Sequence, residues 1–159
     1  MAIQATIKSN SKIISKKFKH LESKLPRIID KGLKQAGFQL LDIIRTKTQK
    51  GQDFRGRPFA PYSEGYLKRL QREGKPTGID LFYSGRMMGS LTPSSTVKKT
   101  GRNKISLAFN NAQMRQRALF NQVLGNTKRE FFSFNSRTEN IIGKAFNRFV
   151  EKQIRATRI

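Results

Sequence analysis

The chain has 159 residues, of which 33 are Lys or Arg and 10 are Asp or Glu, so its formal net charge is +23 at pH 7. It has no cysteine, which excludes disulfides, thiolate metal sites and cysteine nucleophiles. It also has no apolar run of the roughly 18 residues that a membrane-spanning helix needs. Its length is that of one domain. Because the positive charge is spread along the whole chain, we expect a partner that supplies negative charge: nucleic acid, an acidic protein or an anionic membrane.

The N-terminal residues are predicted to form an arm. Residues 2–8 alternate weakly between apolar and polar side chains, which predicts a short edge strand. Residues 9–19 are rich in Lys, Ser and Asn and contain no acid. We therefore expect residues 1–19 to be a basic arm that is mobile or is ordered by a partner, ahead of a single domain over residues 20–159. The first apolar stretch is too short for a secretory signal, so synthesis in a cytoplasm is expected.

Apolar side chains at helical spacing predict the first long helix, from Leu21 to Lys47. They lie within an arc of roughly 160°. The side chains in this arc are Leu21, Leu25, Ile28, Ile29, Leu33, Ala36, Leu40 and Ile44. Pro26 suits only a first turn, so the regular helix is expected to begin near it. Gly37, in the middle of the helix, predicts a close crossing with another helix.

Residues 51–63 combine glycines, prolines and aromatic side chains, and this composition predicts a loop. Its three rings, Phe54, Phe59 and Tyr62, are too many for a solvated linker. We therefore expect the loop to be pinned to the core. A short helix is predicted over residues 63–72, with the serine at its start as the cap.

The middle of the chain is predicted to contain two short strands between helices. A short helix is expected over Ser84–Leu91, followed by strands at residues 93–99 and 103–109 that are joined by a hairpin turn. The second strand alternates apolar and polar side chains, as a half-buried antiparallel strand does. A further helix is expected over residues 113–124, where a glycine follows.

The last helix is the clearest element of the sequence. Ser136 and Glu139 have the spacing of a capping box, and the helix is predicted to run to about Arg155. Its apolar face holds Ile142, Ala145, Phe146, Phe149 and Val150, and an arc of roughly 80° on the other side holds Arg137, Lys144, Arg148, Lys152 and Arg155. We interpret this basic face as a surface for DNA or for an acidic partner, and an ordinary solvated face is the alternative. Two long amphipathic helices packed on a small antiparallel sheet or hairpin predict an α+β fold.

The sequence contains no compact catalytic motif. His20 stands in a lysine-rich stretch without a group to orient it as a base, so we interpret it as a surface residue. The acids of the loop-rich middle are Asp53, Glu64, Glu73 and Asp80, and a metal-dependent nuclease would keep its carboxylates in such a region. No two of them have the spacing of a known motif. We predict no catalytic residue, metal or cofactor, and a nuclease or toxin is the weakest of the alternatives.

Five segments in order resemble the phage virion morphogenesis family, to which the G-like tail-completion protein of phage Mu belongs. Residues 53–63 are similar to the family's turn-rich segment, with Phe where the family commonly has Trp, and residues 80–91 are similar to its "iL..tG.L..si" segment. A hairpin follows at residues 93–109, as in the family. Residues 118–125 are similar to its "yA..hn.G" segment, and residues 129–133 are similar to its "R.ff..s" segment.

The resemblance implies a non-enzymatic structural subunit of a tailed-phage particle, without cofactor. The family's members are components of the neck, in tail completion or head–tail joining, and a homo-oligomeric ring around the DNA channel is implied. The expected partners are connector or tail-tube proteins and double-stranded DNA met through its backbone, with no membrane; the expected location is the virion. We assign inter-subunit contacts to the loop residues Phe54, Pro58, Phe59, Pro61 and Tyr62. The alternative is a non-sequence-specific nucleic-acid-binding protein.

Overall fold

The computed structural model describes residues 11–79, 81, 85–125 and 127–157. Within these residues the fold combines helices with a small antiparallel sheet, which confirms the predicted α+β class. In chain order the elements are α1 Ser11–Gln49, α2 Glu64–Arg72, α3 Arg86–Gly89, α4 Pro93–Thr96, β1 Val97–Gly101, β2 Lys104–Leu107, α5 Ala112–Leu119, the π-helical turn η1 Phe120–Leu124, and α6 Ser136–Ala156. The strand predicted over residues 2–8 lies outside the described residues.

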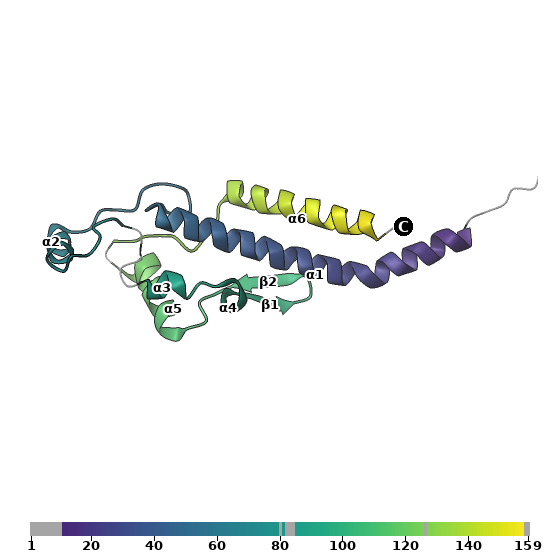
Figure 1. Ribbon diagram of the computed structural model, residues 1–159, viewed down its shortest axis with the longest axis horizontal. Helices are drawn as coiled ribbons and strands as arrows, with labels where there is room; N and C mark the ends of the chain where they lie inside the picture. The colour runs from purple at the N-terminus through teal and green to yellow at the C-terminus, as the bar shows by residue number, and fades with distance from the viewer. Residues whose placement is uncertain (1–10, 80, 82–84, 126, 158–159) are drawn as a thin grey trace, which may run out of the picture.

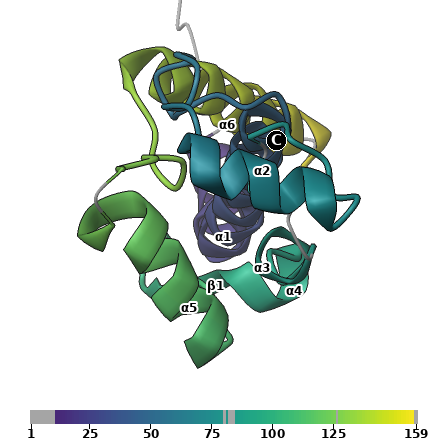
Figure 2. The ribbon, with the colours of Figure 1, turned by 90° about the vertical axis from the view of Figure 1, so that its left-hand side faces the viewer.

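Helix α1 is the central layer of the molecule (Figure 1). Helix α6 packs along one side of it, and the hairpin of β1 and β2 packs on another side. The end-on view in Figure 2 shows α6 and the β1 region on opposite sides of α1. Helix α2 lies at one end of the molecule, and the N-terminal part of α1 extends past the end of α6 at the other end (Figure 1). One helix therefore supports both of the other layers.

Helix α1 begins earlier than the sequence predicted. It starts at Ser11 instead of Leu21, and Pro26 lies inside it instead of in its first turn. A proline removes one helical hydrogen bond and crowds the preceding turn, which bends a helix without always ending it. Figure 1 shows such a bend in the N-terminal half of α1. Residues 11–20 are exposed throughout. The segment expected to be an arm is thus, from Ser11 on, an exposed helical extension.

Helix α6 lies on α1 at a glycine. A Cβ atom added at Gly32 would lie 2.9 Å from Phe146 Cε2 and 3.1 Å from Phe149 Cδ1. The two rings therefore rest directly on the backbone of α1, and they belong to the apolar face predicted for the last helix. Because the apolar stripe of α6 is used in this contact, its opposite side is left to solvent.

The cap of α6 differs from the prediction by one residue. The N-cap is Asn135, whose Oδ1 accepts hydrogen bonds from the main-chain N–H and the hydroxyl of Thr138, both at 3.0 Å. Thr138 is buried. The capping box predicted from Ser136 and Glu139 is therefore wrong. Asn and Ser are about equally good N-caps, and the side chain that is placed to reach the third residue is decided by packing.

The hairpin is shorter than predicted. Its strands pair antiparallel with Val97 opposite Leu107. The first half of the predicted first strand is helix α4 instead, capped by Thr92 and begun by a proline, a residue favoured at the first helical position. The turn between the strands includes Asn103 with φ of 55°, a left-handed conformation that Asn tolerates better than most residues.

Gly37 marks the second close approach to α1. A Cβ atom there would lie 2.7 Å from both Ile105 Cδ1 and Val97 Cγ1. The sequence predicted a helix crossing at this glycine, and the structure corrects the partner: the hairpin lies over Gly37, and the helix crossing is at Gly32. An ion pair between Lys99 and Asp30 also links the hairpin to α1.

The main core lies between the C-terminal half of α1 and the segments folded around it. Its buried residues are Leu41, Ile44, Phe59, Met87, Met88, Leu91, Val97, Phe109, Met114, Ala118 and Phe131. The loop over residues 51–63 contributes Phe59, which is 6% exposed, so the prediction that this loop is pinned is confirmed. Main-chain hydrogen bonds hold the loop at Phe59 N to Gly51 O (2.8 Å) and at Phe54 N to Glu130 O (2.9 Å).

We expect Gly37→Ala to lower the free energy of unfolding by about 1–3 kcal/mol, because the added methyl group overlaps Val97, whose β-branched side chain has little freedom to move. Gly143→Ala is the matched control. Gly143 is exposed on α6, and a Cβ there would meet nothing within 4 Å. Alanine at this position should raise stability by up to about 1 kcal/mol. Urea unfolding measures both changes, and a gain at Gly37 equal to that at Gly143 would contradict the close packing of the hairpin.

Candidate functional site

The basic face of α6 is solvent-exposed along its length. Its members Arg137, Lys144, Arg148, Lys152 and Arg155 are all exposed. Among the described residues none of the five forms an ion pair. The structure therefore brings these predicted residues together on one open side of α6, away from α1. Exposed side chains of this kind can turn toward an anionic partner without first breaking an internal contact.

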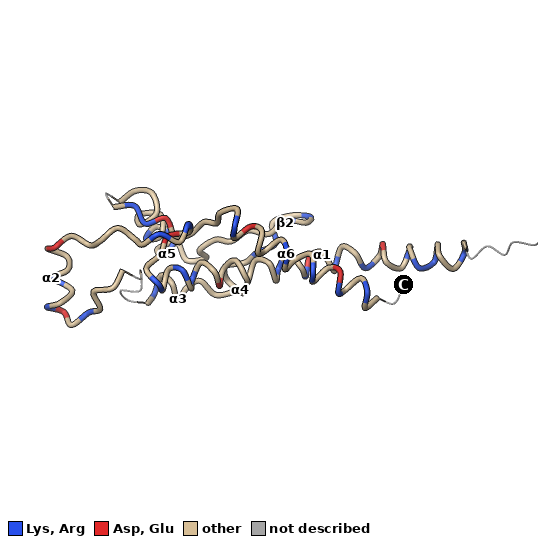
Figure 3. The backbone as a smooth tube through the Cα atoms, turned by 90° about the horizontal axis from the view of Figure 1, so that it is seen from above, with Lys and Arg blue, Asp and Glu red and all other residues tan. Residues whose placement is uncertain are grey.

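The positive charge is not confined to α6. Figure 3 shows Lys and Arg along the whole length of the molecule, from the N-terminal extension of α1 to α2. Acids are sparse beside them. In the described part of the chain, Asp30, Asp53, Glu73 and Glu130 form ion pairs. Most basic side chains thus face solvent without a counter-charge, and no single face of the protein holds them all.

The loop predicted to make inter-subunit contacts is built around Asp53. Its Oδ1 accepts hydrogen bonds from the main-chain N–H groups of Arg55 and Arg57, both at 2.8 Å, and its Oδ2 accepts one from Arg57 Nε at 3.1 Å. Burial raises the pKa of the Asp53 carboxyl, but these hydrogen bonds and the Arg57 charge outweigh burial and hold its pKa below the ordinary value of 3.8. The carboxylate therefore fixes the turn of the loop.

The five predicted contact residues of this loop differ in exposure. Pro58 and Pro61 are exposed, Phe54 and Tyr62 are half-buried, and Phe59 is buried in the core. Phe59 consequently offers no surface to a partner, and its assignment to an inter-subunit contact is corrected. The other four lie along the outside of the loop, and Tyr62 faces a pocket.

The candidate acids of a nuclease do not gather. The Asp53 carboxylate is already used within its own loop, Glu73 pairs with Arg69 at 3.6 Å, and Glu64 is exposed in the first turn of α2. Asp80 lies outside the described residues. His20 is exposed on the extension of α1. Across residues 11–79, 81, 85–125 and 127–157, no three His, Cys, Asp or Glu side chains are close enough to hold a metal ion.

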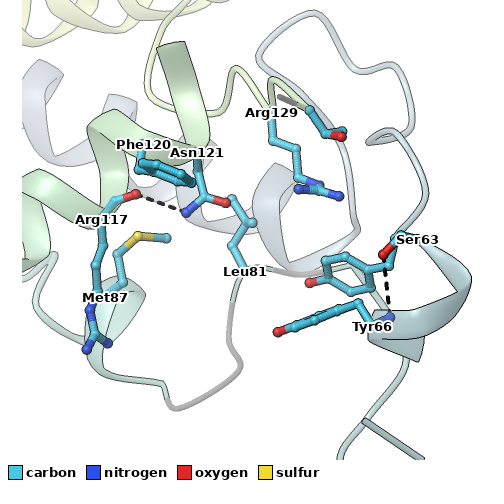
Figure 4. A pocket seen from close by; sticks show the side chains of 10 residues that line it. Ser63, Tyr66, Leu81, Met87, Arg117, Phe120, Asn121 and Arg129 are labelled. Carbon is cyan, nitrogen blue, oxygen red and sulfur yellow. Dashed lines mark hydrogen bonds between the residues drawn. The ribbon is translucent and has the colours of Figure 1, made fainter. Parts of the chain in front are cut away.

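A pocket of about 610 Å³ opens between the loop, α2, α3 and the α5–η1 segment (Figure 4). It is lined by Tyr62, Ser63, Tyr66, Leu81, Met87, Arg117, Phe120, Asn121, Thr127 and Arg129. Sequence reasoning missed this pocket, because its lining comes from segments that are far apart in the chain. The resemblance did include Arg129, but gave it no role.

Arg129 is the buried charge of this pocket. It is only 9% exposed, and its Nη2 donates to the main-chain oxygens of Ala60 (3.1 Å) and Pro61 (3.4 Å). Its guanidinium carbon lies 4.8 Å from the centre of the Tyr62 ring. Its Nε is buried without any acceptor. Among the described residues no acid forms an ion pair with it, so within this part of the chain the buried positive charge has no counter-charge.

Apolar side chains are exposed at both ends of the molecule. Beside the pocket, the α5–η1 segment exposes Leu119, Phe120, Val123 and Leu124. The sequence predicted one regular helix there, but α5 ends at Leu119 and the π-helical turn η1 follows it. At the other end, the extension of α1 exposes Ile13, Ile14 and Phe18. Clusters of exposed large apolar side chains are typical of surfaces that contact another molecule.

Comparison with known protein families, with curated proteins and with solved structures finds no match for this chain. None of the described helices combines the length and the apolar character that crossing a membrane requires. The site is therefore interpreted from its own residues: an exposed basic face on α6, two exposed apolar ends, and a pocket that contains a buried cation.

We expect Asp53→Asn to destabilise the protein by about 1–3 kcal/mol at pH 7, because the amide cannot supply a charged acceptor to three donors. The folded pKa of Asp53 is lowered, so its contribution to stability is present above pH 3.8 and is lost as the pH falls through the folded value. The gap between wild type and variant should therefore close below about pH 4. Urea unfolding at a series of pH values measures this gap. Asp42→Asn, an exposed position on α1, is the control, and a gap for Asp53→Asn that does not change with pH would contradict the assignment.

Proposed function

We propose that this protein is a structural subunit of a tailed-phage particle, a tail-completion or head–tail joining component that forms a ring around the DNA channel. The observation that carries the proposal is the excess of positive charge. The chain has a net charge of +23, and within the described residues the whole basic face of α6 is exposed and forms no ion pair. A compact chain with this charge is under self-repulsion, and a polyanionic neighbour relieves it. Double-stranded DNA or an acidic connector protein supplies that neighbour in a phage neck.

Shape and apolar surface support assembly into a ring. The exposed apolar side chains of the α1 extension and those of the α5–η1 segment lie at opposite ends of an elongated molecule (Figure 1). Two different contact surfaces on one chain give head-to-tail association, which closes into a ring when the rotation between subunits allows it. The resemblance of the five ordered segments to the phage virion morphogenesis family points the same way.

The second candidate is a free nucleic-acid-binding protein without sequence preference. The exposed arc of Lys and Arg on α6 favours it, because such an arc can follow a phosphate backbone. The exposed apolar ends favour the ring subunit instead, since phosphate contacts make no use of Ile, Leu or Phe. The two candidates also differ in salt dependence. A protein that binds free duplex through α6 loses roughly one unit of log–log salt slope for each phosphate contact removed.

The functional test replaces four basic residues of α6 in a phage that encodes this protein: Lys144→Gln, Arg148→Gln, Lys152→Gln and Arg155→Gln. The matched control removes four exposed charges from other elements: Lys68→Gln, Arg102→Gln, Lys104→Gln and Arg115→Gln. We expect the α6 variant to yield at least about ten-fold fewer infectious particles than the control, because four contacts of about 0.5 kcal/mol each exceed the 1.4 kcal/mol of a ten-fold change. Plaque titre is the measurement. Equal titres for the α6 variant and the control would show that the basic face of α6 is not needed for assembly. The second candidate would be favoured if the wild-type protein bound free duplex DNA with a steep dependence on salt and only the α6 variant reduced that dependence.

A further inference from the structure

The pocket beside the α5–η1 segment has the size and lining of a ligand site. Its volume of about 610 Å³ lies within the range that small ligands and peptide side chains occupy in proteins. The lining combines aromatic and aliphatic walls with a few polar groups. Figure 4 shows the Arg129 guanidinium directed into the space between Asn121 and Tyr66, with Leu81, Met87 and Phe120 across from it. The pocket is therefore apolar on one side and cationic on the other.

The buried positive charge of Arg129 favours binding of an anion in the pocket. A buried cation costs several kcal/mol unless an acid or a full set of hydrogen bonds compensates it. Two main-chain oxygens share Nη2, Nε has no acceptor, and within the described chain Nη1 makes no hydrogen bond. The free side of the guanidinium faces the pocket, as Figure 4 shows. A carboxylate placed there would supply the missing acceptor and the missing charge.

Arg117 adds a second positive charge. It lies at the rim of the pocket beside Met87 (Figure 4) and is exposed. A carboxylate that reaches Arg129 would also pass through the field of Arg117, which raises its rate of association. No acid is among the described residues that line this pocket, so none of these lining residues offers a carboxylate to either cation.

The apolar walls of the pocket favour a ligand that carries an apolar group beside its carboxylate. Phe120 is 61% exposed although it lines the pocket, and Leu119, Val123 and Leu124 extend the exposed apolar surface beside it. A hydrocarbon or aromatic side chain bound against Phe120, Met87 and Leu81 would remove this apolar surface from water, which favours binding. The walls consequently fit a ligand in which an acid and an apolar side chain are neighbours.

We propose that this pocket binds a peptide segment of an acidic partner protein in which a Glu or Asp side chain stands next to an apolar one, with the carboxylate on Arg129 and the apolar side chain against Phe120 and Met87. A planar carboxylate matches the fork of a guanidinium, and such pairs are short and strong. The preference for an acidic and apolar ligand follows from the residues of the pocket alone and does not depend on the proposed function. Only the source of the peptide, an acidic neighbour in the particle, rests on the proposed function.

A peptide fits the pocket better than a nucleotide. Base recognition in a pocket of this kind would use the tyrosine rings for stacking. Each ring already has a guanidinium over it, Arg129 at 4.8 Å for Tyr62 and Arg69 at 4.8 Å for Tyr66, and the ring centres lie 4.8 Å apart. Little of either ring face is therefore open to a base. Regular duplex DNA is also too wide to bring a phosphate to the guanidinium of Arg129, a residue that is only 9% exposed.

The test measures binding of a labelled hexapeptide in which Glu alternates with Phe and Leu, and of a twin with Gln in place of Glu. Fluorescence anisotropy with the full chain at physiological salt reports both affinities. We expect the Glu peptide to bind at least about ten-fold more tightly than the Gln twin, because the amide cannot form the charge-assisted hydrogen bonds that the carboxylate forms with a guanidinium. Arg129→Lys, which keeps the charge and loses the fork, should weaken the Glu peptide by a similar factor.

Surface variants keep the test independent of folding. Arg117→Gln and Phe120→Ser change exposed side chains of the pocket and should each weaken the Glu peptide by at least about three-fold. Arg115→Gln, exposed on the same helix and outside the pocket lining, removes the same charge as Arg117→Gln and should leave the affinity unchanged. Thermal unfolding of each variant shows that it is folded.

Three outcomes would overturn the proposal. Equal affinities for the Glu and Gln peptides would show that the carboxylate is not recognised. Equal losses of affinity for Arg115→Gln and Arg117→Gln would show that the peptide is held only by the general positive charge of the protein. Displacement of the Glu peptide by a short DNA duplex, with the same dependence on Arg117 and Phe120, would make phosphate the ligand. Each result is obtained with purified protein. The peptide-binding proposal can therefore be contradicted while phage assembly still depends on α6, and the proposed function can be contradicted while the pocket still binds the peptide.

Discussion

The packing of one long helix against two different layers is the constraint on which the rest of this structure depends. Helix α1 receives the Phe rings of α6 at Gly32 and the hairpin at Gly37, and both contacts need the absence of a side chain. Because the apolar stripe of α6 packs against α1, the basic arc on the opposite side of α6 faces solvent. The same helix anchors the core that holds the loop at residues 51–63, and so it positions the pocket at the end of the molecule.

The excess of positive charge is the feature of this fold that points most directly to a function. The acids that form ion pairs do so in local roles: Asp53 fixes a loop turn, and Asp30 links α1 to the hairpin. Most of the other described basic side chains are exposed, and Arg129 is buried without an ion pair to any described acid. Surface charge of this kind contributes little to stability by itself. We therefore infer that the excess serves association with anionic partners.

The sequence predicted those features that repeat with a helical or strand period. The two faces of α6 and the pinned loop with Phe59 were predicted, since periodicity and aromatic content report burial directly. Local patterns that several residues could satisfy were less informative: Asn135 caps α6 in place of Ser136, and Pro26 bends α1 without ending it. The pocket was not predictable, because tertiary packing alone brings Arg129 beside residues of α2 and η1.

The neck assignment is tested most directly by electron microscopy of lysates from a phage in which this gene is disrupted. If the protein joins heads to tails, the lysate should contain DNA-filled heads beside detached tails, and tails of irregular length would instead identify a terminator within the same assembly role. Supplying the intact protein should restore complete particles. Intact, infectious virions in the absence of the protein would contradict the assignment, and a free nucleic-acid-binding role would then be the better account of its charge.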